Sequence, residues 1–241
     1  MDLDITEVGD GEALVVFVHG VLGRGSSFDR VADLLTSRCR MRWYDRRGYG
    51  RSRDANGPCG IETHVTDLLA LLDDRPVVVV GHSFGGVTAM GAAVGGRGVV
   101  DALVLYETSM AWVPGFDDRV MEGVLSAEDP DVAGLRMMLG DRYDAMSDDE
   151  RARRRLDAKA FIAEERSVRG GAPPFDVAEI RAPIVYGRSD PGVMPEVIDH
   201  LQRHVEHVEV VTLAGVGHHA HRTAPEAFAQ LVRRGLDLAH V

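Results

Sequence analysis

Residues 77–86 read VVVVGHSFGG, four valines followed by a glycine-rich turn that carries one serine. Four consecutive β-branched residues favour a buried strand, and the small residues at 85–93 favour a helix packed closely on a sheet. Between them lies the Gly-x-Ser-x-Gly pattern of a sharp strand-to-helix turn. Such a turn strains the serine backbone and leaves no room for side chains two residues away, which explains both glycines. The pattern predicts an exposed, activated serine, Ser83.

Apolar strands and amphipathic helices alternate on both sides of this turn. Further buried strands are predicted at residues 14–18, 41–44, 102–106, 184–186 and 208–213. This alternation predicts an α/β fold, a mostly parallel sheet with helices on both faces. Only helical patterns occur between residues 109 and 175. We therefore expect one α/β core (residues 1–108 and 176–241) interrupted by a helical insertion (residues 109–175).

Composition argues against several classes of protein. The 241 residues include 27 basic and 38 acidic side chains, a net charge of −11, which argues against nucleic acid as the main partner. The single lysine, Lys159, has no glycine-rich loop before it, which argues against a P-loop nucleotide site. Two cysteines cannot form a disulfide framework, and we find neither a membrane-spanning apolar run nor a signal peptide. We expect a cytoplasmic protein.

Several segments together resemble the α/β-hydrolase family. Besides the serine turn, residues 19–23 (HGVLG) resemble the family's oxyanion loop, and residues 45–52 (DRRGYGRS) resemble a loop common in its esterase-like members. The helical insertion resembles the family's lid. The resemblance implies an enzyme without a cofactor, whose catalytic residues follow the chain order serine, acid, histidine.

The resemblance assigns Ser83 as the nucleophile, Asp190 as the acid and His218 as the base. Asp190 and His218 each follow a predicted strand, and His218 stands directly after a Gly-x-Gly segment. His218 would take the proton of Ser83 while Asp190 orients the histidine ring. Glu107 is an alternative acid, because some family members recruit their acid from the strand that it follows.

Two neighbouring histidines, His219 and His221, are alternatives for the base. The family places its histidine directly after Gly-x-Gly, which favours His218. The three histidines could also bind a metal ion, but no carboxylate-rich partner motif accompanies them, so we expect no metal.

The resemblance also implies an oxyanion hole built from backbone N–H groups. Val21 and Phe84 are the expected donors, with Leu22 as the alternative to Val21. Backbone donors carry no side-chain signature, so this assignment comes from the family alone.

Methionines and aromatic residues in the insertion could line a pocket for an apolar group. The candidate pocket residues are Leu22, Met110, Trp112, Met137 and Met138. Packing of the insertion on the core is the alternative role for such side chains. Arginines 153–155 could attract an anionic substrate, but the acidic residues 148–150 nearby favour a solvated helix face.

A serine nucleophile favours acyl transfer to water, whereas epoxide opening and halide displacement need a carboxylate at this position. We expect a carboxylesterase-like serine hydrolase that acts on an ester, thioester or lactone of a small to medium, apolar acyl substrate. C–C bond hydrolysis, acyl transfer, cofactor-free haloperoxidase-like chemistry and a small-molecule receptor without turnover are the alternatives. The sequence does not determine the oligomeric state.

Overall fold

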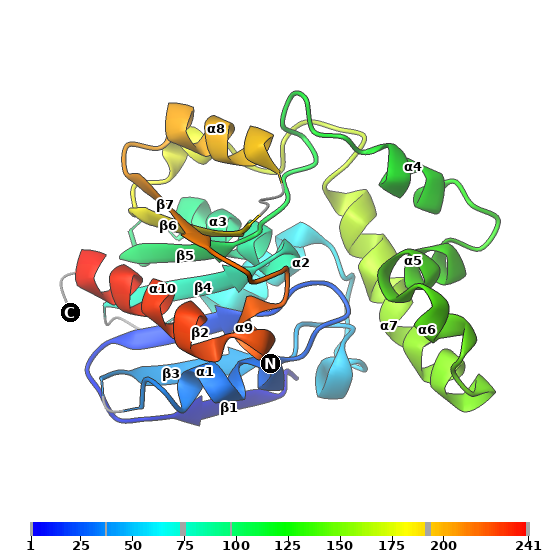
Figure 1. Ribbon diagram of the computed structural model, residues 1–241, viewed down its shortest axis with the longest axis horizontal. Coiled ribbons are helices and arrows are strands. Elements are labelled where there is room, and N and C mark those ends of the chain that lie inside the picture. The colour runs from blue at the N-terminus through cyan, green and yellow to red at the C-terminus, as the bar shows by residue number, and fades with distance from the viewer. Residues whose placement is uncertain (1, 37, 73–75, 97, 191–193, 240–241) are drawn as a thin grey trace.

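A central sheet organises the molecule (Figure 1), a computed structural model that describes residues 2–36, 38–72, 76–96, 98–190 and 194–239. Within these residues the sheet has seven strands in the order β1-β3-β2-β4-β5-β6-β7. The strands are β1 (Ile5–Val8), β2 (Leu14–Val18), β3 (Arg40–Tyr44), β4 (Val77–His82), β5 (Ala102–Tyr106), β6 (Ile184–Ser189) and β7 (Val208–Leu213). Among these described strands, β1 alone pairs antiparallel, with β3. The predicted α/β fold with a mostly parallel sheet is confirmed.

Helices cover both faces of the sheet. One face carries α2 (Ile61–Leu69), α3 (Phe84–Gly95) and α8 (Pro195–His204), and the other carries α1 (Asp29–Ala32), α9 (Ala220–Thr223) and α10 (Pro225–Leu238). Successive strand residues point to opposite faces, so Val16 of β2 joins one core while Val15 and Phe17 join the other. Burial on both faces explains why these strands are apolar throughout.

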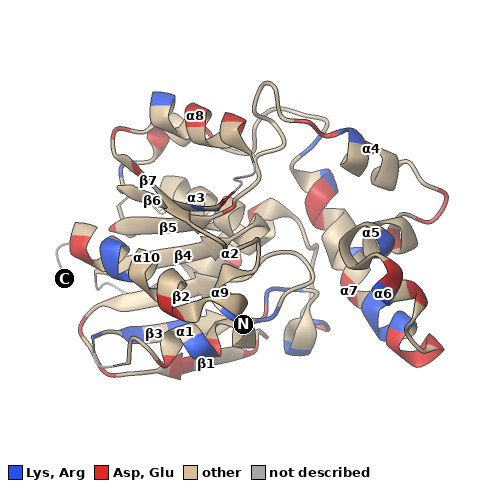
Figure 2. Ribbon diagram, viewed as in Figure 1, with Lys and Arg blue, Asp and Glu red and all other residues tan. Residues whose placement is uncertain are grey.

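The insertion adds four described helices between β5 and β6, beside the core in Figure 1. They are α4 (Arg119–Leu125), α5 (Pro130–Leu139), α6 (Asp141–Asp144) and α7 (Asp148–Ser167). The α7 helix begins with a capping box, in which Ser147 accepts from the Glu150 N–H and the Glu150 carboxylate accepts from the Ser147 N–H. Residues of both charges gather on α6 and α7 (Figure 2). Among the described helices, none is both long and apolar enough to cross a membrane.

Candidate active site

Ser83 occupies the turn between β4 and α3 with strained backbone angles. Its φ is 53° and its ψ is −127°, a conformation that a residue with a side chain rarely adopts. The Ser83 N–H donates to the carbonyl of Tyr106 at 2.9 Å, which fixes the turn to the end of β5. The predicted strand-to-helix turn is confirmed, and its strain is typical of a functional position.

The glycines around Ser83 are required by close approach of the backbone. A Cβ at Gly81 would clash with the backbone of Gly86, and one at Gly85 would clash with the carbonyl oxygen of Val18. The tight turn therefore depends on glycine at both positions, as the pattern implies.

Within the described residues His218 is paired with Glu107, the alternative acid, and not with Asp190, the acid that the resemblance assigned. His218 Nδ1 lies 2.8 Å from Glu107 Oε2. The other carboxylate oxygen of Glu107 accepts hydrogen bonds from the backbone N–H of Ser189, at 2.9 Å, and from its hydroxyl. Ser189 ends β6, and successive residues of an extended chain point in opposite directions, so Ser189 faces Glu107 while Asp190 is exposed.

Glu107 is held as a buried carboxylate at the end of β5. Burial by itself would raise the pKa of Glu107, but the hydrogen bonds from His218 and Ser189 outweigh it and lower that pKa. An ionised Glu107 favours the tautomer of His218 with the proton on Nδ1, which leaves Nε2 free to accept a proton. This is the arrangement that a general base requires.

The loop that carries His218 is tied to the strand ends beside Ser83. His82 Nε2 lies 2.8 Å from the backbone oxygen of His218, and the two rings are 4.6 Å apart. The hydroxyl of Tyr106 donates to the carbonyl of Gly217 at 3.0 Å. Within the described residues no hydrogen bond joins Ser83 Oγ to His218, but both residues lie at the same edge of the sheet.

The other histidines near His218 have surroundings that favour a neutral ring. Burial lowers the pKa of His221 to about 3, and the His221 ring packs against Phe28. Burial and neighbouring histidines also lower the pKa of His82 and His219. In the described part of the chain, no group of three or more potential ligands is placed to hold a metal ion.

The predicted oxyanion loop lies directly against the serine turn. A Cβ on Gly20 would lie 2.9 Å from the Cβ of Ser83. Phe84 is the first residue of α3, so its N–H belongs to the helix N-terminus, where intrahelical acceptors are missing. Leu22 has a φ of 53°, which shapes the loop that follows Val21. The role of the Val21 and Phe84 N–H groups stays a prediction.

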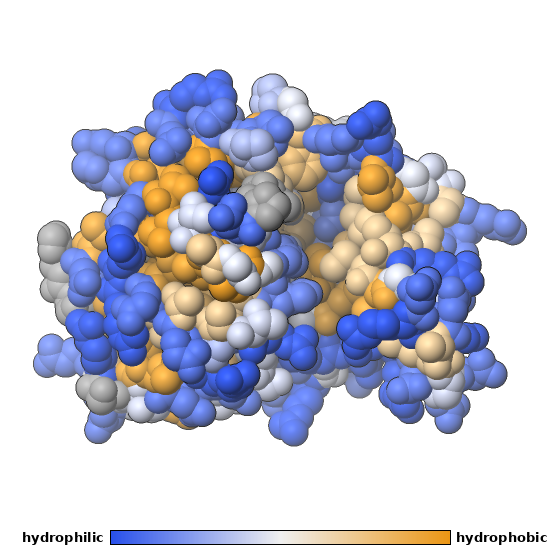
Figure 3. All heavy atoms as spheres, viewed as in Figure 1, coloured by the Kyte–Doolittle hydropathy of each residue, from blue (hydrophilic) through white to orange (hydrophobic). Residues whose placement is uncertain are grey.

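A cleft of about 910 Å³ separates the core from the insertion (Figure 3). It reaches Gly20 and His82, the neighbours of Ser83, although neither Ser83 nor His218 is among its described lining residues. The cleft therefore adjoins the turn that carries Ser83, and a bound molecule could extend from this turn into it.

Of the five predicted pocket residues, Leu22 and Met138 line this cleft. The other three are not among the described residues that line it. Met110 is fully buried in the main core. Trp112 packs against Phe175, with 5.4 Å between ring centroids, and the side chain of Met137 is exposed. Met110 and Trp112 therefore pack on the core, the alternative role for such side chains.

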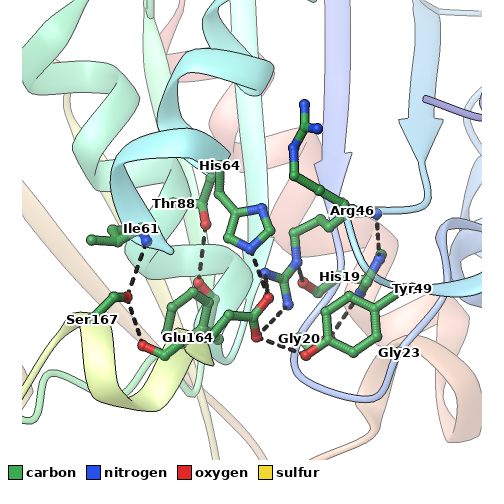
Figure 4. A network of polar contacts seen from close by, with 12 residues as sticks. His19, Gly20, Gly23, Arg46, Tyr49, Ile61, His64, Thr88, Glu164 and Ser167 are labelled. Atoms are coloured by element: carbon green, nitrogen blue, oxygen red, sulfur yellow. Dashed lines mark hydrogen bonds and ion pairs between the residues drawn. The ribbon is translucent and has the colours of Figure 1, made fainter. Parts of the chain in front are cut away.

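A second polar cluster, which sequence reasoning missed, joins the insertion to the core (Figure 4). We call Arg46, Tyr49, His64 and Glu164 the Glu164 cluster. The Glu164 carboxylate contacts Arg46 through both oxygens, at 2.5 and 3.3 Å. It also accepts from the Tyr49 hydroxyl at 2.8 Å and lies 2.8 Å from His64 Nε2. No local pattern could have revealed this cluster, because its members come from three segments far apart in the chain.

Comparison with known sequences identifies the family. Residues 15–231 match the family described as "Alpha/beta hydrolase family", and the chain belongs to it. The chain is 38% identical over 133 residues to Lipase LipV of Mycobacterium tuberculosis (strain ATCC 25618 / H37Rv), which covers 54% of this chain and 50% of that protein. It is 35% identical over 108 residues to the sn-1-specific diacylglycerol lipase ABHD11 of Mus musculus, covering 42% and 35%. The matched stretches thus span half or less of these curated relatives.

A solved structure gives the same fold. The chain superposes on a thermophilic esterase from Thermogutta terrifontis with a TM-score of 0.75, covering 99% of this chain and 94% of that one. Only 18% of the aligned residues are identical, so this likeness supports the fold and not the substrate.

Proposed function

We propose that the protein is a serine hydrolase that cleaves a carboxylic ester through an acyl-enzyme on Ser83. The observation that carries the proposal is the pairing of His218 with a buried carboxylate, Glu107, at the sheet edge where the strained Ser83 turn lies. The names of the sequence relatives, a lipase and a diacylglycerol lipase, support ester chemistry. Thioesters and lactones would react by the same route.

In the first half-reaction, Ser83 Oγ attacks the carbonyl carbon of the ester while its proton passes to His218 Nε2. The negative charge that develops on the carbonyl oxygen would be stabilised by the N–H groups of Phe84 and Val21. Glu107 stabilises the imidazolium of His218. Collapse of the tetrahedral intermediate breaks the bond to the alcohol oxygen, which leaves with the proton of His218.

In the second half-reaction, water attacks the acyl-enzyme. His218 takes one proton from this water, and the new tetrahedral intermediate breaks its bond to Ser83 Oγ. The carboxylic acid departs and Ser83 recovers its proton. The insertion would act as a lid over this edge, held to the core by the Glu164 cluster.

The test is covalent labelling with a fluorophosphonate, followed by intact mass measurement and mapping of the modified peptide. We expect one adduct, on Ser83, that is lost in His218→Ala. Esters of increasing acyl length should then show a burst of alcohol release when acylation is faster than deacylation. A folded protein that forms no adduct would overturn the proposal and favour a receptor that binds without turnover.

A further inference from the structure

The cleft beside Ser83 carries a charge opposite to that of the whole protein. Among its described lining residues are seven arginines and two carboxylates, Glu150 and Asp157. The described lining thus has an excess of five positive charges in a chain whose net charge is −11. A concentration of one sign of charge in a concave site raises the local concentration of ligands of the opposite sign.

On the core side, the arginines are Arg24, Arg30, Arg53 and Arg222. Arg24 and Arg53 share one carboxylate, Asp157, at 2.6 and 2.9 Å, so this group leaves an unbalanced positive charge. The Nε atom of Arg53 is buried and has no hydrogen-bond partner in the described residues. An unpaired buried donor is costly unless a ligand supplies an acceptor.

On the insertion side, the arginines are Arg142, Arg153 and Arg154. In the part of the chain that the structure describes, none of the three has a carboxylate within ion-pair distance, and the same holds for Arg30 and Arg222. The sequence favoured a solvated helix face for residues 153–155. The structure separates them, because Arg155 pairs with Asp129 at 2.7 Å while its two neighbours line the cleft.

The positive charge of the cleft therefore comes from guanidinium groups and not from histidine. The pKa of each of the four lining histidines, His19, His82, His219 and His221, is lowered mainly by burial. Arginine stays charged at any physiological pH and presents paired donors that match the two oxygens of a carboxylate or phosphate.

We infer that this cleft binds an anionic group, a carboxylate or a phosphate, on the acyl part of the ester that Ser83 attacks. The inference rests on the proposed function and adds the substrate class to it. The cleft reaches Gly20, which lies against Ser83, and His82, which precedes it, so a chain whose carbonyl lies at Ser83 can place its far end among the arginines. The lining residues Leu22, Leu139 and Met146 would contact the apolar part of that chain.

The test compares two esters with the same leaving group and the same chain length, mono-4-nitrophenyl adipate and 4-nitrophenyl hexanoate. The adipate ester ends in a carboxylate, and the hexanoate ester ends in a methyl group. We expect kcat/KM for the adipate ester to exceed that for the hexanoate ester by about tenfold or more, through a lower KM. The advantage should shrink as the salt concentration rises from about 0.1 M to about 1 M.

Two variants on α7 locate the effect. The double variant Arg153→Gln/Arg154→Gln should reduce the preference for the adipate ester by about tenfold, whereas the matched control Arg155→Gln should keep it. Free adipate and inorganic phosphate are then compared as competitive inhibitors of ester hydrolysis. Stronger inhibition by adipate indicates a carboxylate site, and stronger inhibition by phosphate indicates a phosphate site.

Equal kcat/KM for the two esters, or a preference that Arg155→Gln reduces as much as the double variant does, would overturn the inference. This failure is distinct from failure of the proposed function. If only the inference fails, Ser83 is still labelled and both esters are cleaved. If the proposed function fails, neither labelling nor cleavage occurs.

Discussion

Two of the carboxylate–histidine pairs in the described part of the chain have the same separation and different surroundings. Glu107 Oε2 lies 2.8 Å from His218 Nδ1, and Glu164 Oε1 lies 2.8 Å from His64 Nε2. The side chain of His218 is 34% exposed, whereas His64 and Glu164 are both completely buried.

The surroundings of each pair determine whether its histidine is placed to act as a general base. His218 lies at the sheet edge that carries the strained Ser83 turn; Glu107 contacts its Nδ1, and its Nε2 has no hydrogen bond within the described residues. His64 is enclosed, and its carboxylate partner is neutralised by Arg46. A carboxylate–histidine contact is therefore not by itself a sign of catalysis. Under the proposed function, exposure to substrate and the Ser83 turn at the same sheet edge distinguish the Glu107–His218 pair, whereas the buried Glu164–His64 pair joins the insertion to the core.

The largest expected effect is on activity, in His218→Ala. Without the base, kcat should fall by about 10⁴-fold or more, while the free energy of unfolding changes little because this side chain is partly exposed. Ester hydrolysis and chemical denaturation measure the two effects. His207→Gln, on an exposed surface histidine, is the control. Near-normal activity in His218→Ala together with loss of activity in His221→Ala would move the base to His221.

Disruption of the Glu164–His64 pair should reduce stability much more than activity. Glu164→Gln leaves the guanidinium of Arg46 buried without a counter-charge, so we expect a loss of about 3–5 kcal/mol in the free energy of unfolding. Activity per folded molecule should fall far less than in His218→Ala. Asp144→Asn, which breaks the exposed Arg136–Asp144 pair, is the control and should cost less than about 1 kcal/mol. Wild-type stability in Glu164→Gln would mean that the cluster does not anchor the insertion.

A smaller effect concerns the pH dependence of stability. The pKa of His221 is about 3 in the folded protein, against an ordinary value near 6.5. Between these values the unfolded chain binds a proton that folded His221 does not, so stability rises with pH across this range. His221→Phe, which suits the contacts with Phe28 and Phe228, should reduce this slope by up to about 1.4 kcal/mol per pH unit. Denaturation at several pH values measures it, and an unchanged slope would contradict the account.

The fold was predictable from sequence because its signals are local. The valine run of β4 and the Gly-x-Ser-x-Gly turn specify a strand, a strained serine and a helix within one short segment, and the structure has all three. The capping box at Ser147 is equally local, since both of its hydrogen bonds span three residues.

The acid was not predictable in the same way. Glu107 and Asp190 both follow parallel strands at the same edge of the sheet, and the chain order serine, acid, histidine fits either. The choice depends on which side chain points toward His218. In the structure Glu107 does so, and it also accepts a hydrogen bond from Ser189 at the end of β6. The Glu164 cluster and the arginine-lined cleft depend likewise on how the insertion packs on the core.

The measurement that tests the account most directly is kcat/KM for ester hydrolysis by Glu107→Gln and Asp190→Asn, each compared with the wild type. Both variants replace a carboxylate with an amide of nearly the same shape. The account predicts that Glu107→Gln loses about 10³- to 10⁴-fold, because His218 no longer has a carboxylate to fix its tautomer, and that Asp190→Asn stays within about twofold of the wild type. A large loss in Asp190→Asn with little change in Glu107→Gln would contradict it.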